Sequence, residues 1–484
     1  MLNLNPLRLG HLSRKAAWVG TSKATALVCI LASDVFLARR LVKSDFGLYQ
    51  QGWLLIRTLI PILLLGSNQA VNYFIPPAPD HQKRGYIHAF FRILFLTGLA
   101  GVLVCLFFPN FLSRVIGNRE ASPFLPVFGL YVFLVLPSYL MEPLLIIRKR
   151  PRELFAWTLL FSVIFLSIAL LWGRSANIRA IFISLCVLAF LKSSITLIRA
   201  LGVYGPGKWT VFPEHRGKIL KFTGVLGMIA FVDVLTVQID KYIVSHFAGA
   251  GRFALYHVGA LEIPFIGLLL GSVTAVVMPE LATYLSQEKK EQAIDLLHRS
   301  MVKLSVFMLP LFFYSMITAG FYIPFLFGEK YRASVLIFCI YLGLLPIRGL
   351  NNHPYLIAAG LQKYALYARI IDVSVNFILG ICLLRWIGLA GPAVSTLVAS
   401  YIHKIYQTAI VCRFLKLSPR QVYPWKNLWD IAWRSVLCSL PLLAIILVFG
   451  HHIVAVIAGT IVFTGCYFLI LSRFPVKINR SPVI

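Results

Sequence analysis

The sequence predicts an all-α, polytopic membrane protein with about 14 transmembrane helices. Three observations lead to this fold class. Hydrophobic residues make up 59% of the 484 residues, charged residues make up only 13%, and the mean hydropathy is +0.82. A soluble domain is about half apolar and about a quarter charged. Most of this chain must therefore have lipid rather than water as its solvent.

Apolar segments long enough to cross a bilayer recur along the whole chain. A bilayer core of about 30 Å requires about 20 mostly apolar residues in a helix. Windows of this length predict spans at 17–38, 48–75, 86–109, 122–146, 154–172, 177–199, 219–246, 254–278, 302–327, 333–359, 364–384, 388–411, 428–449 and 453–472.

The formal net charge of +29 is distributed as expected for a membrane protein. When the N-terminus is placed in the cytoplasm, the cytoplasmic tails and loops hold more than twice as many Lys and Arg as the opposite side. The positive-inside rule then predicts an inner-membrane protein with both termini in the cytoplasm. The loops are too short for nucleic-acid binding, so their cations are assigned to topology and to contact with anionic membrane lipids.

Matching phrases indicate an internal duplication. FGLYQQGWL (Phe46–Leu54) is repeated as FALYHVGAL (Phe253–Leu261), and EPLLI (Glu142–Ile146) as HPYLI (His353–Ile357). Lys192 and Thr196 recur as Lys404 and Thr408 at nearly the same offset. Six spans separate the copies, which predicts two parallel, pseudo-symmetric six-helix lobes of the kind found in transporters. The expected division is an N-lobe at 1–212 with helices 1–6, a C-lobe at 213–412 with helices 7–12, and a C-terminal helix pair at 413–484.

Some charged residues lie within the predicted spans, where a charge costs about 2.5–3.5 kcal/mol even on the mildest scale. Lys23 shares one face of the first span with Asp34, and Arg57 shares a face of the second span with Asn68. We expect both cations to face a polar interior. Asn72 flanks the second stripe, and Pro61 is expected to bend that helix. Five other cations lie near cytoplasmic ends and are expected to extend to the headgroups: Arg92, Lys192, Arg369, Lys404 and Arg434.

Two spans carry paired prolines at equivalent places in the predicted repeats. PIRGLNNHP (Pro346–Pro354) contains Arg348, Asn351 and Asn352, and PSYLMEP (Pro137–Pro143) is its counterpart. Helix breaks at matching positions in two repeats are typical of transport sites. We therefore expect helix breaks here, beside a cavity.

Further candidates are less specific. Asp34, Asp233 and Glu262 are the acids considered for coupling to H⁺ or Na⁺. The segment 279–304 has apolar residues at helical spacing and is predicted to be an amphipathic helix in the membrane interface. The chain has no GxxxxGK[ST] loop, no HExxH and no CxxC, so no cofactor, metal site or enzymatic activity is expected.

Two motifs resemble a known family. The end of the seventh span at Asp240–Lys241, followed by FALYHVGAL, and the earlier ARRLVKSDFGLYQQGWL (Ala38–Leu54) resemble the polysaccharide transporters of the multidrug/oligosaccharidyl-lipid/polysaccharide exporter superfamily. These are the Wzx-type flippases of lipid-linked oligosaccharides. The resemblance implies two lobes around a central cavity and transfer of an isoprenoid-pyrophosphate-linked oligosaccharide from the cytoplasmic to the outer leaflet by alternating access.

The resemblance also suggests roles for the candidate residues. Related lipid flippases use cavity cations for the pyrophosphate, and Lys23 and Arg57 occupy comparable early helices. Arg348 is a further cation, and Asn68, Asn72, Asn351 and Asn352 offer amide groups to a sugar. The eighth span carries no arginine, a departure that leaves the second lobe's part in binding open. The partners implied are the lipid-linked oligosaccharide and a polysaccharide polymerase.

Two other functions remain open at this level. A multidrug or small-solute antiporter of the same superfamily would favour carboxylates in its lumen, whereas cations outnumber acids in these spans. A membrane polysaccharide polymerase or ligase would need catalytic groups on a sizeable external loop. The longest external loop, at about 110–121, offers only Glu120 as an acid.

Overall fold

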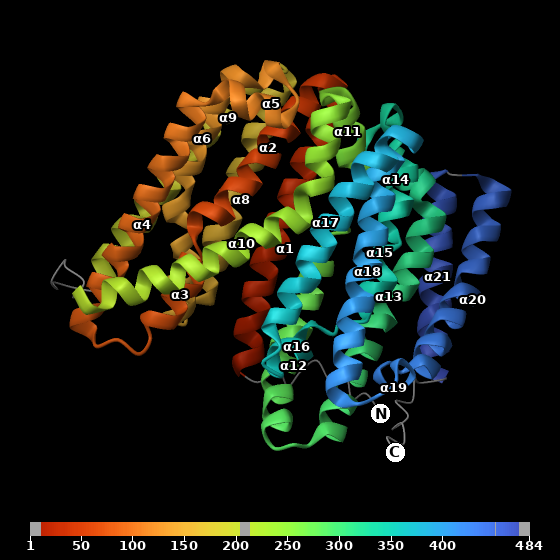
Figure 1. Cartoon of the computed structure of the whole chain (residues 1–484). Helices are drawn as coiled ribbons and strands as arrows, with labels where there is room; N and C mark the ends of the chain where they lie inside the picture. The colour runs from red at the N-terminus through yellow and green to blue at the C-terminus, as the bar shows by residue number, and fades with distance from the viewer. Residues whose placement is uncertain (1–10, 204–212, 451, 474–484) are drawn as a thin grey trace. The chain divides into compact units, whose positions relative to one another are not determined.

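The computed structural model describes residues 11–203, 213–450 and 452–473, and every regular element within these ranges is a helix (Figure 1). Twelve helical segments are long and apolar enough to cross a membrane. Two further predicted spans correspond to a broken segment from Ser334 to Ala358 and to α18 (Ala390–Leu415), which carries polar residues such as Lys404. The prediction of an all-α membrane protein with about 14 spans is confirmed.

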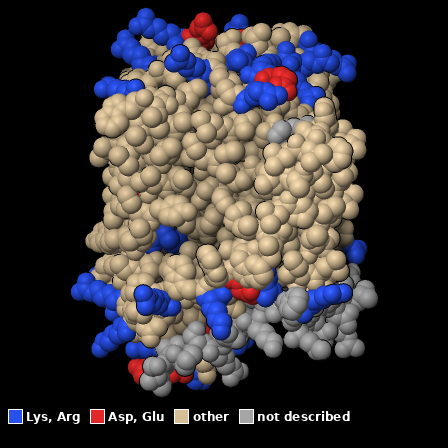
Figure 2. All heavy atoms as spheres, turned by 90° about the vertical axis from the view of Figure 1, so that its right-hand side faces the viewer, with Lys and Arg blue, Asp and Glu red and all other residues tan. Residues whose placement is uncertain are grey.

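On one outer face of the molecule, charged side chains are concentrated toward the ends of the helices. On the face drawn in Figure 2, Lys and Arg gather in two bands, and the broad zone between them is almost entirely uncharged. A helix satisfies its backbone groups internally, which allows it to cross the hydrocarbon region that lies between two such bands.

The described chain falls into two compact units. The N-terminal unit runs from His11 to Ala254 and the C-terminal unit from Leu255 to Arg473, so the boundary lies within α11 (Ala250–Gly259). The duplication itself, with limits at 212 and 412, stays a prediction.

The N-terminal unit contains ten α-helices and two 3₁₀ segments before α11. They are α1 (His11–Arg40), α2 (Lys43–Leu64), α3 (Ser67–Phe74), α4 (Asp80–Phe107), α5 (Pro109–Ile116), η1 (Arg119–Phe124), α6 (Leu125–Val135), η2 (Leu136–Leu140), α7 (Met141–Ile147), α8 (Pro151–Arg174), α9 (Ile178–Val203) and α10 (Pro213–Ala248). Helix α1 packs along α8, α4 packs along α6, and α9 contacts both α6 and α8. Helix α10 packs against α2 and α3, which lie beside it in Figure 1.

The second predicted span is interrupted four residues after Pro61, the residue expected to bend it. Pro61 lies inside α2, and the break falls at Leu65 and Gly66, which both adopt left-handed backbone conformations with φ of 46° and 63°. Glycine adopts this conformation without a steric penalty, whereas leucine does so at a cost. The break separates α3 from α2 and turns the chain beside α10.

The expected breaks in the proline-rich segments are confirmed. PSYLMEP forms the 3₁₀ segment η2 and the first turn of α7. In PIRGLNNHP, the helix stops after Gly349 and resumes at His353. In the second case Pro354 lies in the first turn of α16, where its missing N–H removes no helical hydrogen bond.

The C-terminal unit continues from the end of α11. Its elements are α12 (Ile266–Ser286), α13 (Lys290–Phe327), η3 (Glu329–Tyr331), α14 (Ser334–Leu342), α15 (Leu344–Gly349), α16 (His353–Ala358), α17 (Gln362–Ile387), α18 (Ala390–Leu415), α19 (Pro419–Val422), α20 (Trp425–Phe449) and α21 (Ile453–Arg473). Helix α13 is central to the packing and contacts α12, α14, α15 and α20. Helices α17 and α18 form one close antiparallel pair, and α20 and α21 form another.

Two sequence predictions were wrong in this unit. The span at 254–278 is not continuous, because α11 ends at Gly259 and α12 begins at Ile266. Pro264 lies in the interruption, and Phe265 has a positive φ of 75°. A proline lacks the N–H that a continuous helix would need there, so the interruption had a signal in the sequence.

The amphipathic segment at 279–304 is not an interfacial helix either. It forms the end of α12, a turn and the start of α13. Its apolar residues Leu281, Ile294, Leu297 and Met301 are at most 3% exposed and pack in a cluster with residues of α16, α17 and α18. The apolar face is therefore covered by protein rather than by lipid.

Gly47, in the repeated phrase, provides a test of the N-terminal packing. A Cβ at this position of α2 would overlap the backbone carbonyl group of Ala250, which cannot move as a flexible side chain can. We expect Gly47→Ala to lower stability by about 1–3 kcal/mol, the usual cost of overpacking. The thermal midpoint of the purified protein, followed by fluorescence-detected size exclusion, measures the effect.

Gly224→Ala is the matched control, because no atom lies within 4 Å of a Cβ built on this glycine of α10. A midpoint that drops equally for both variants would show that the contact at Gly47 is not the cause.

Candidate functional site

The N-terminal unit contains a partly open cavity of about 680 Å³. Small-molecule sites usually measure about 300–1,000 Å³. The walls come from α1, α2, α3, α6, η2, α8, α9 and α10. Its charged lining residues are Asp34, Arg57 and Lys192, so cations outnumber acids in its wall.

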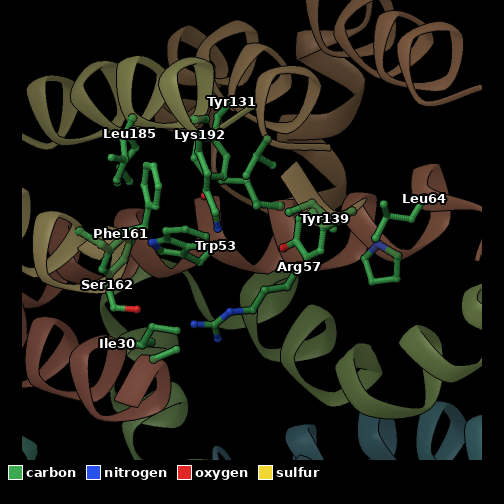
Figure 3. Close-up of a pocket in the computed structure, with 18 of the residues that line it drawn as sticks. Ile30, Trp53, Arg57, Leu64, Tyr131, Tyr139, Phe161, Ser162, Leu185 and Lys192 are labelled. Atoms are coloured by element: carbon green, nitrogen blue, oxygen red, sulfur yellow. The ribbon is translucent and has the colours of Figure 1, made fainter. Parts of the chain in front are cut away.

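Arg57 enters this cavity from α2 (Figure 3). Its guanidinium lies 5.8 Å from the centre of the Trp53 ring, one turn earlier on the same helix. A cation over a tryptophan face gains about 0.5–2 kcal/mol, which offsets part of the cost of removing the charge from water. The guanidinium is also close enough to attract the carboxylate of Asp34. Arg57 therefore faces a cavity between membrane-spanning helices.

Asp34 is held by the repeated phrase itself. The Gln50 amide donates a hydrogen bond to its Oδ1 at 2.9 Å, and both side chains are buried. The next residue, Gln51, donates to Ser245 of α10 at 2.9 Å and accepts a hydrogen bond from Asn118 at 2.7 Å. FGLYQQGWL therefore anchors α1 and α10 around α2. Neither glutamine is among the residues that the sequence predicts for the site.

Lys192 lies in a different environment from the one predicted for it. It was expected to extend to the headgroups, but the structure places it in the cavity wall on α9, with its ammonium 5.7 Å from the centre of the Phe161 ring. Figure 3 shows its side chain extending into the space that Arg57 enters from α2. Its recurrence as Lys404 was the available signal in the sequence.

Aromatic rings cover much of the remaining wall. Trp53 makes edge-to-face contacts with Tyr131 at 5.7 Å and with Phe165 at 5.8 Å between ring centres. The other aromatic lining residues are Tyr49, Tyr139, Trp157 and Phe161. Tyrosine and tryptophan combine a large apolar surface with one polar group, a combination suited to amphipathic ligands.

The other candidates of the N-terminal unit lie in different surroundings. Asn68 lines the cavity, whereas Asn72 is exposed on α3 and is not among the lining residues. Lys23 was expected to share a polar helix face with Asp34, but it is not among the residues that line the cavity with Asp34. Its Nζ instead forms an ion pair with Oε1 of Glu142 on α7 at 2.9 Å. Asp233 lies half-buried on α10.

In the C-terminal unit, the broken helix gathers three of the predicted residues. Arg348 forms an ion pair with Glu262 at 2.6 Å, which joins α15 to the interruption before α12. The Asn351 amide donates to Thr274 of α12 at 3.2 Å. Asn352 is fully buried, and its amide donates to Tyr423 at 2.8 Å and to Thr408 at 3.2 Å.

The helix break in this unit is also stabilised by Lys404, which donates a hydrogen bond to the Leu350 carbonyl at 2.7 Å. This carbonyl is one that the break frees from helical pairing, and such groups need partners in a membrane. Asn352 and Lys404 therefore stabilise the helix break through their hydrogen bonds. In the parts of the chain that the structure describes, no group of three or more His, Cys, Asp or Glu side chains is placed to hold a metal ion.

The fold defines the class of protein. It is similar to a solved structure of the lipid II flippase MurJ in an inward closed conformation, with a TM-score of 0.74 and 17% identity over 95% of this chain and 98% of that one. It is also similar to an inward-facing multidrug resistance MATE family transporter, with a TM-score of 0.62 and 13% identity over 82% and 98% of the two chains. A transporter from Pyrococcus furiosus gives a TM-score of 0.60 and 13% identity over 84% and 97%. The chain therefore has the fold of the MOP superfamily of transporters and flippases.

The sequence defines the family within this class. The model of the polysaccharide biosynthesis protein family matches residues 36–336, and the chain belongs to this family. A comparison with curated protein sequences gives no significant match.

The charge of the cavity can be measured with thiol reagents. Ser162 of α8 lines the cavity. The test introduces a cysteine at this position in a variant that lacks the eight native cysteines. The reaction rates of this cysteine then report the local electrostatic potential. We expect Ser162→Cys to react several-fold faster with an anionic methanethiosulfonate than with a cationic one, because Arg57 and Lys192 attract anions. Mass spectrometry over time gives the two rates.

Ser286→Cys, at the exposed C-terminal end of α12 with both signs of charge nearby in the sequence, provides the reference ratio for the two reagents. Adding Arg57→Ala should move the Ser162→Cys ratio toward that reference. A preference for the cationic reagent at Ser162→Cys would contradict a positive cavity.

Proposed function

We propose that this protein is a flippase that moves an isoprenoid-pyrophosphate-linked oligosaccharide from the cytoplasmic to the outer leaflet for surface polysaccharide biosynthesis. In this proposal it works by alternating access in the cell inner membrane, with both termini in the cytoplasm. Its family membership and its MOP superfamily fold are compatible with this function, and the cavity chemistry of the N-terminal unit is the observation that favours it.

That observation is the presence of Arg57 and Lys192 in one cavity within membrane-spanning helices. A pyrophosphate that leaves water loses a large hydration energy unless charged donors replace the water. Arginine is suited to this role because its planar guanidinium forms paired hydrogen bonds with phosphate oxygens, and lysine supplies a point charge. Two such cations in one cavity match the head of a pyrophosphate-linked lipid.

The aromatic wall suits the remainder of the head group. Sugar rings have apolar faces and polar edges, and Trp53, Trp157 and Tyr139 offer both kinds of surface. Asn68 adds an amide in the same wall. Asn72, Arg348 and Asn351 lie outside this cavity, and we propose contact with substrate for them only in other conformations of the transport cycle. Asn352 would contact substrate only after its buried hydrogen bonds to Tyr423 and Thr408 are broken.

The same chemistry disfavours the alternative of a multidrug antiporter for organic cations. Such a ligand would meet two cations and a single carboxylate, Asp34, which already accepts a hydrogen bond from Gln50. A polysaccharide polymerase is in this proposal a separate partner that uses the translocated lipid-linked sugar on the outer side. No enzymatic step is assigned to this chain.

Loss of either early cation should block translocation. We expect Arg57→Ala and Lys23→Ala to remain in the membrane at normal levels while lipid-linked oligosaccharide accumulates on the cytoplasmic leaflet and surface polysaccharide falls at least about tenfold. Arg57 would lose a direct phosphate contact, worth about 1.5–3 kcal/mol for a charged hydrogen bond. Immunoblotting, extraction of lipid-linked sugars and quantification of surface polymer in a deletion strain test this.

Arg174→Ala is the control, because this arginine is exposed at the end of α8 and is not among the lining residues. Normal surface polysaccharide from both cation variants would remove Arg57 and Lys23 from the substrate path.

We further propose that Asp34 couples transport to an ion gradient, since its carboxylate lies in the cavity beside Arg57. In proteoliposomes with a fluorescent isoprenoid-pyrophosphate sugar, transport by the wild type should increase several-fold when a proton or sodium gradient is imposed. Asp34→Asn cannot change its charge and should lose this response while retaining the basal rate within about twofold.

Asp80→Asn, an exposed acid paired with Lys83, is the control for a general loss of charge. If Asp34→Asn responds to the gradient like the wild type, coupling must lie elsewhere, with Asp233 and Glu262 as the remaining candidates.

A further inference from the structure

Lys192 has an unusual environment for a cation within a membrane span. Its ammonium faces the ring of Phe161 at 5.7 Å, and in the described parts of the chain it forms neither a hydrogen bond nor an ion pair at contact distance. A charge at this depth normally has a close partner, because a bare charge in a membrane is costly. Glu142 lies on α7, which packs against α9, and its negative charge attracts the Lys192 ammonium.

Glu142 serves a second lysine as well. It lies in the first turn of α7, directly after the 3₁₀ segment η2, and its Oε1 is 2.9 Å from Nζ of Lys23 on α1. One carboxylate therefore balances two ammonium groups that come from α1 and α9. Tyr139, three residues before Glu142, lines the cavity, whereas Glu142 itself is not among the lining residues. The carboxylate thus acts on Lys192 from outside the cavity.

We propose that Glu142 is a resident counterion that a phosphate group displaces. In the empty cavity its carboxylate attracts Lys192 and pairs with Lys23. A pyrophosphate in the cavity competes for the Lys192 ammonium, and Glu142 is left to Lys23 alone. This inference rests on the proposed function, and it adds that Glu142 sets the affinity of the site without touching the ligand.

The physical reason is that the Glu142 carboxylate and the phosphate compete for the same cation, the Lys192 ammonium. A ligand shifts the protein only by the difference between its interactions with the two arrangements. An internal carboxylate that must be displaced lowers the affinity for phosphate, and the lower affinity helps release on the other side of the membrane. The internal anion also prevents the empty protein from holding two unbalanced cations within its spans.

The same unit contains a matched control. Glu153 on α8 lies between two cations in the same way, with Arg150 at 2.7 Å and Arg199 at 3.4 Å. None of these three residues lines the cavity. Neutralising Glu153 removes the same charge from the same unit without freeing a cavity cation.

The experiment uses the full-length protein in lipid nanodiscs with farnesyl pyrophosphate as the probe and farnesol as the phosphate-free reference. Calorimetry gives the dissociation constants, and thermal midpoints show that each variant is folded. We expect E142Q to bind farnesyl pyrophosphate about three- to tenfold more tightly than the wild type, a change typical of one pairwise coupling. E153Q should bind like the wild type.

A double-mutant cycle tests whether Glu142 acts through Lys192. The gain from E142Q should disappear when K192M is already present, because no cation is then left to be released. A gain of the same size in both backgrounds would show a general effect of charge and would overturn the inference. Should E142Q not fold, E142D replaces it: its shorter side chain should also tighten binding, and unchanged or weaker binding would contradict the proposal.

The outcomes separate this inference from the proposed function. If the wild type does not prefer farnesyl pyrophosphate to farnesol, the phosphate site itself is wrong. If the preference is present but E142Q binds like E153Q or more weakly than the wild type, the phosphate site stands and the role of Glu142 as a displaced counterion fails.

Discussion

The high energy of an unbalanced charge within a membrane span is the constraint that organises this molecule. Arg57 lies over the Trp53 ring, Asp34 accepts a hydrogen bond from Gln50, and Lys23 pairs with Glu142. Each of these contacts joins a charge to a protein group, because lipid offers no substitute for water. The exposed pairs contribute little to stability on their own. Their main effect is to determine where the charges lie, and hence where a polar ligand can be accommodated.

The same constraint explains the polar cluster at the broken helix of the C-terminal unit. The interruption after Gly349 frees backbone carbonyls, and Lys404 donates to one of them, that of Leu350. Asn351 and Asn352 use their amides to join the break to α12, to α18 and to Tyr423. PIRGLNNHP was predicted to be a binding site because of its paired prolines and its polar residues. The same polar residues also supply the hydrogen bonds that a helix break in a membrane requires. In the N-terminal unit Lys192, which the sequence repeats as Lys404, faces the Phe161 ring and lines a cavity instead.

The repeated phrase shows how local sequence and tertiary packing combine. FGLYQQGWL lies within α2, which begins at Lys43. The pattern does not reveal that Gln50 and Gln51 point to different partners, Asp34 on α1 and Ser245 on α10. Those partners lie 16 and 194 residues away along the chain. The phrase is important because adjacent polar residues on one helix anchor two other helices.

The sequence by itself determined the membrane character, the helical class, the approximate number of spans and the helix breaks in PSYLMEP and PIRGLNNHP. These properties follow from hydropathy over about 20 residues and from proline, both of which act locally. Only the tertiary structure placed Lys192 in the cavity, buried Asn352 and covered the apolar face of 279–304 with protein. The reason is that hydropathy states how apolar a helix face is, whereas only its packing against distant segments decides whether that face meets lipid, another helix or a cavity.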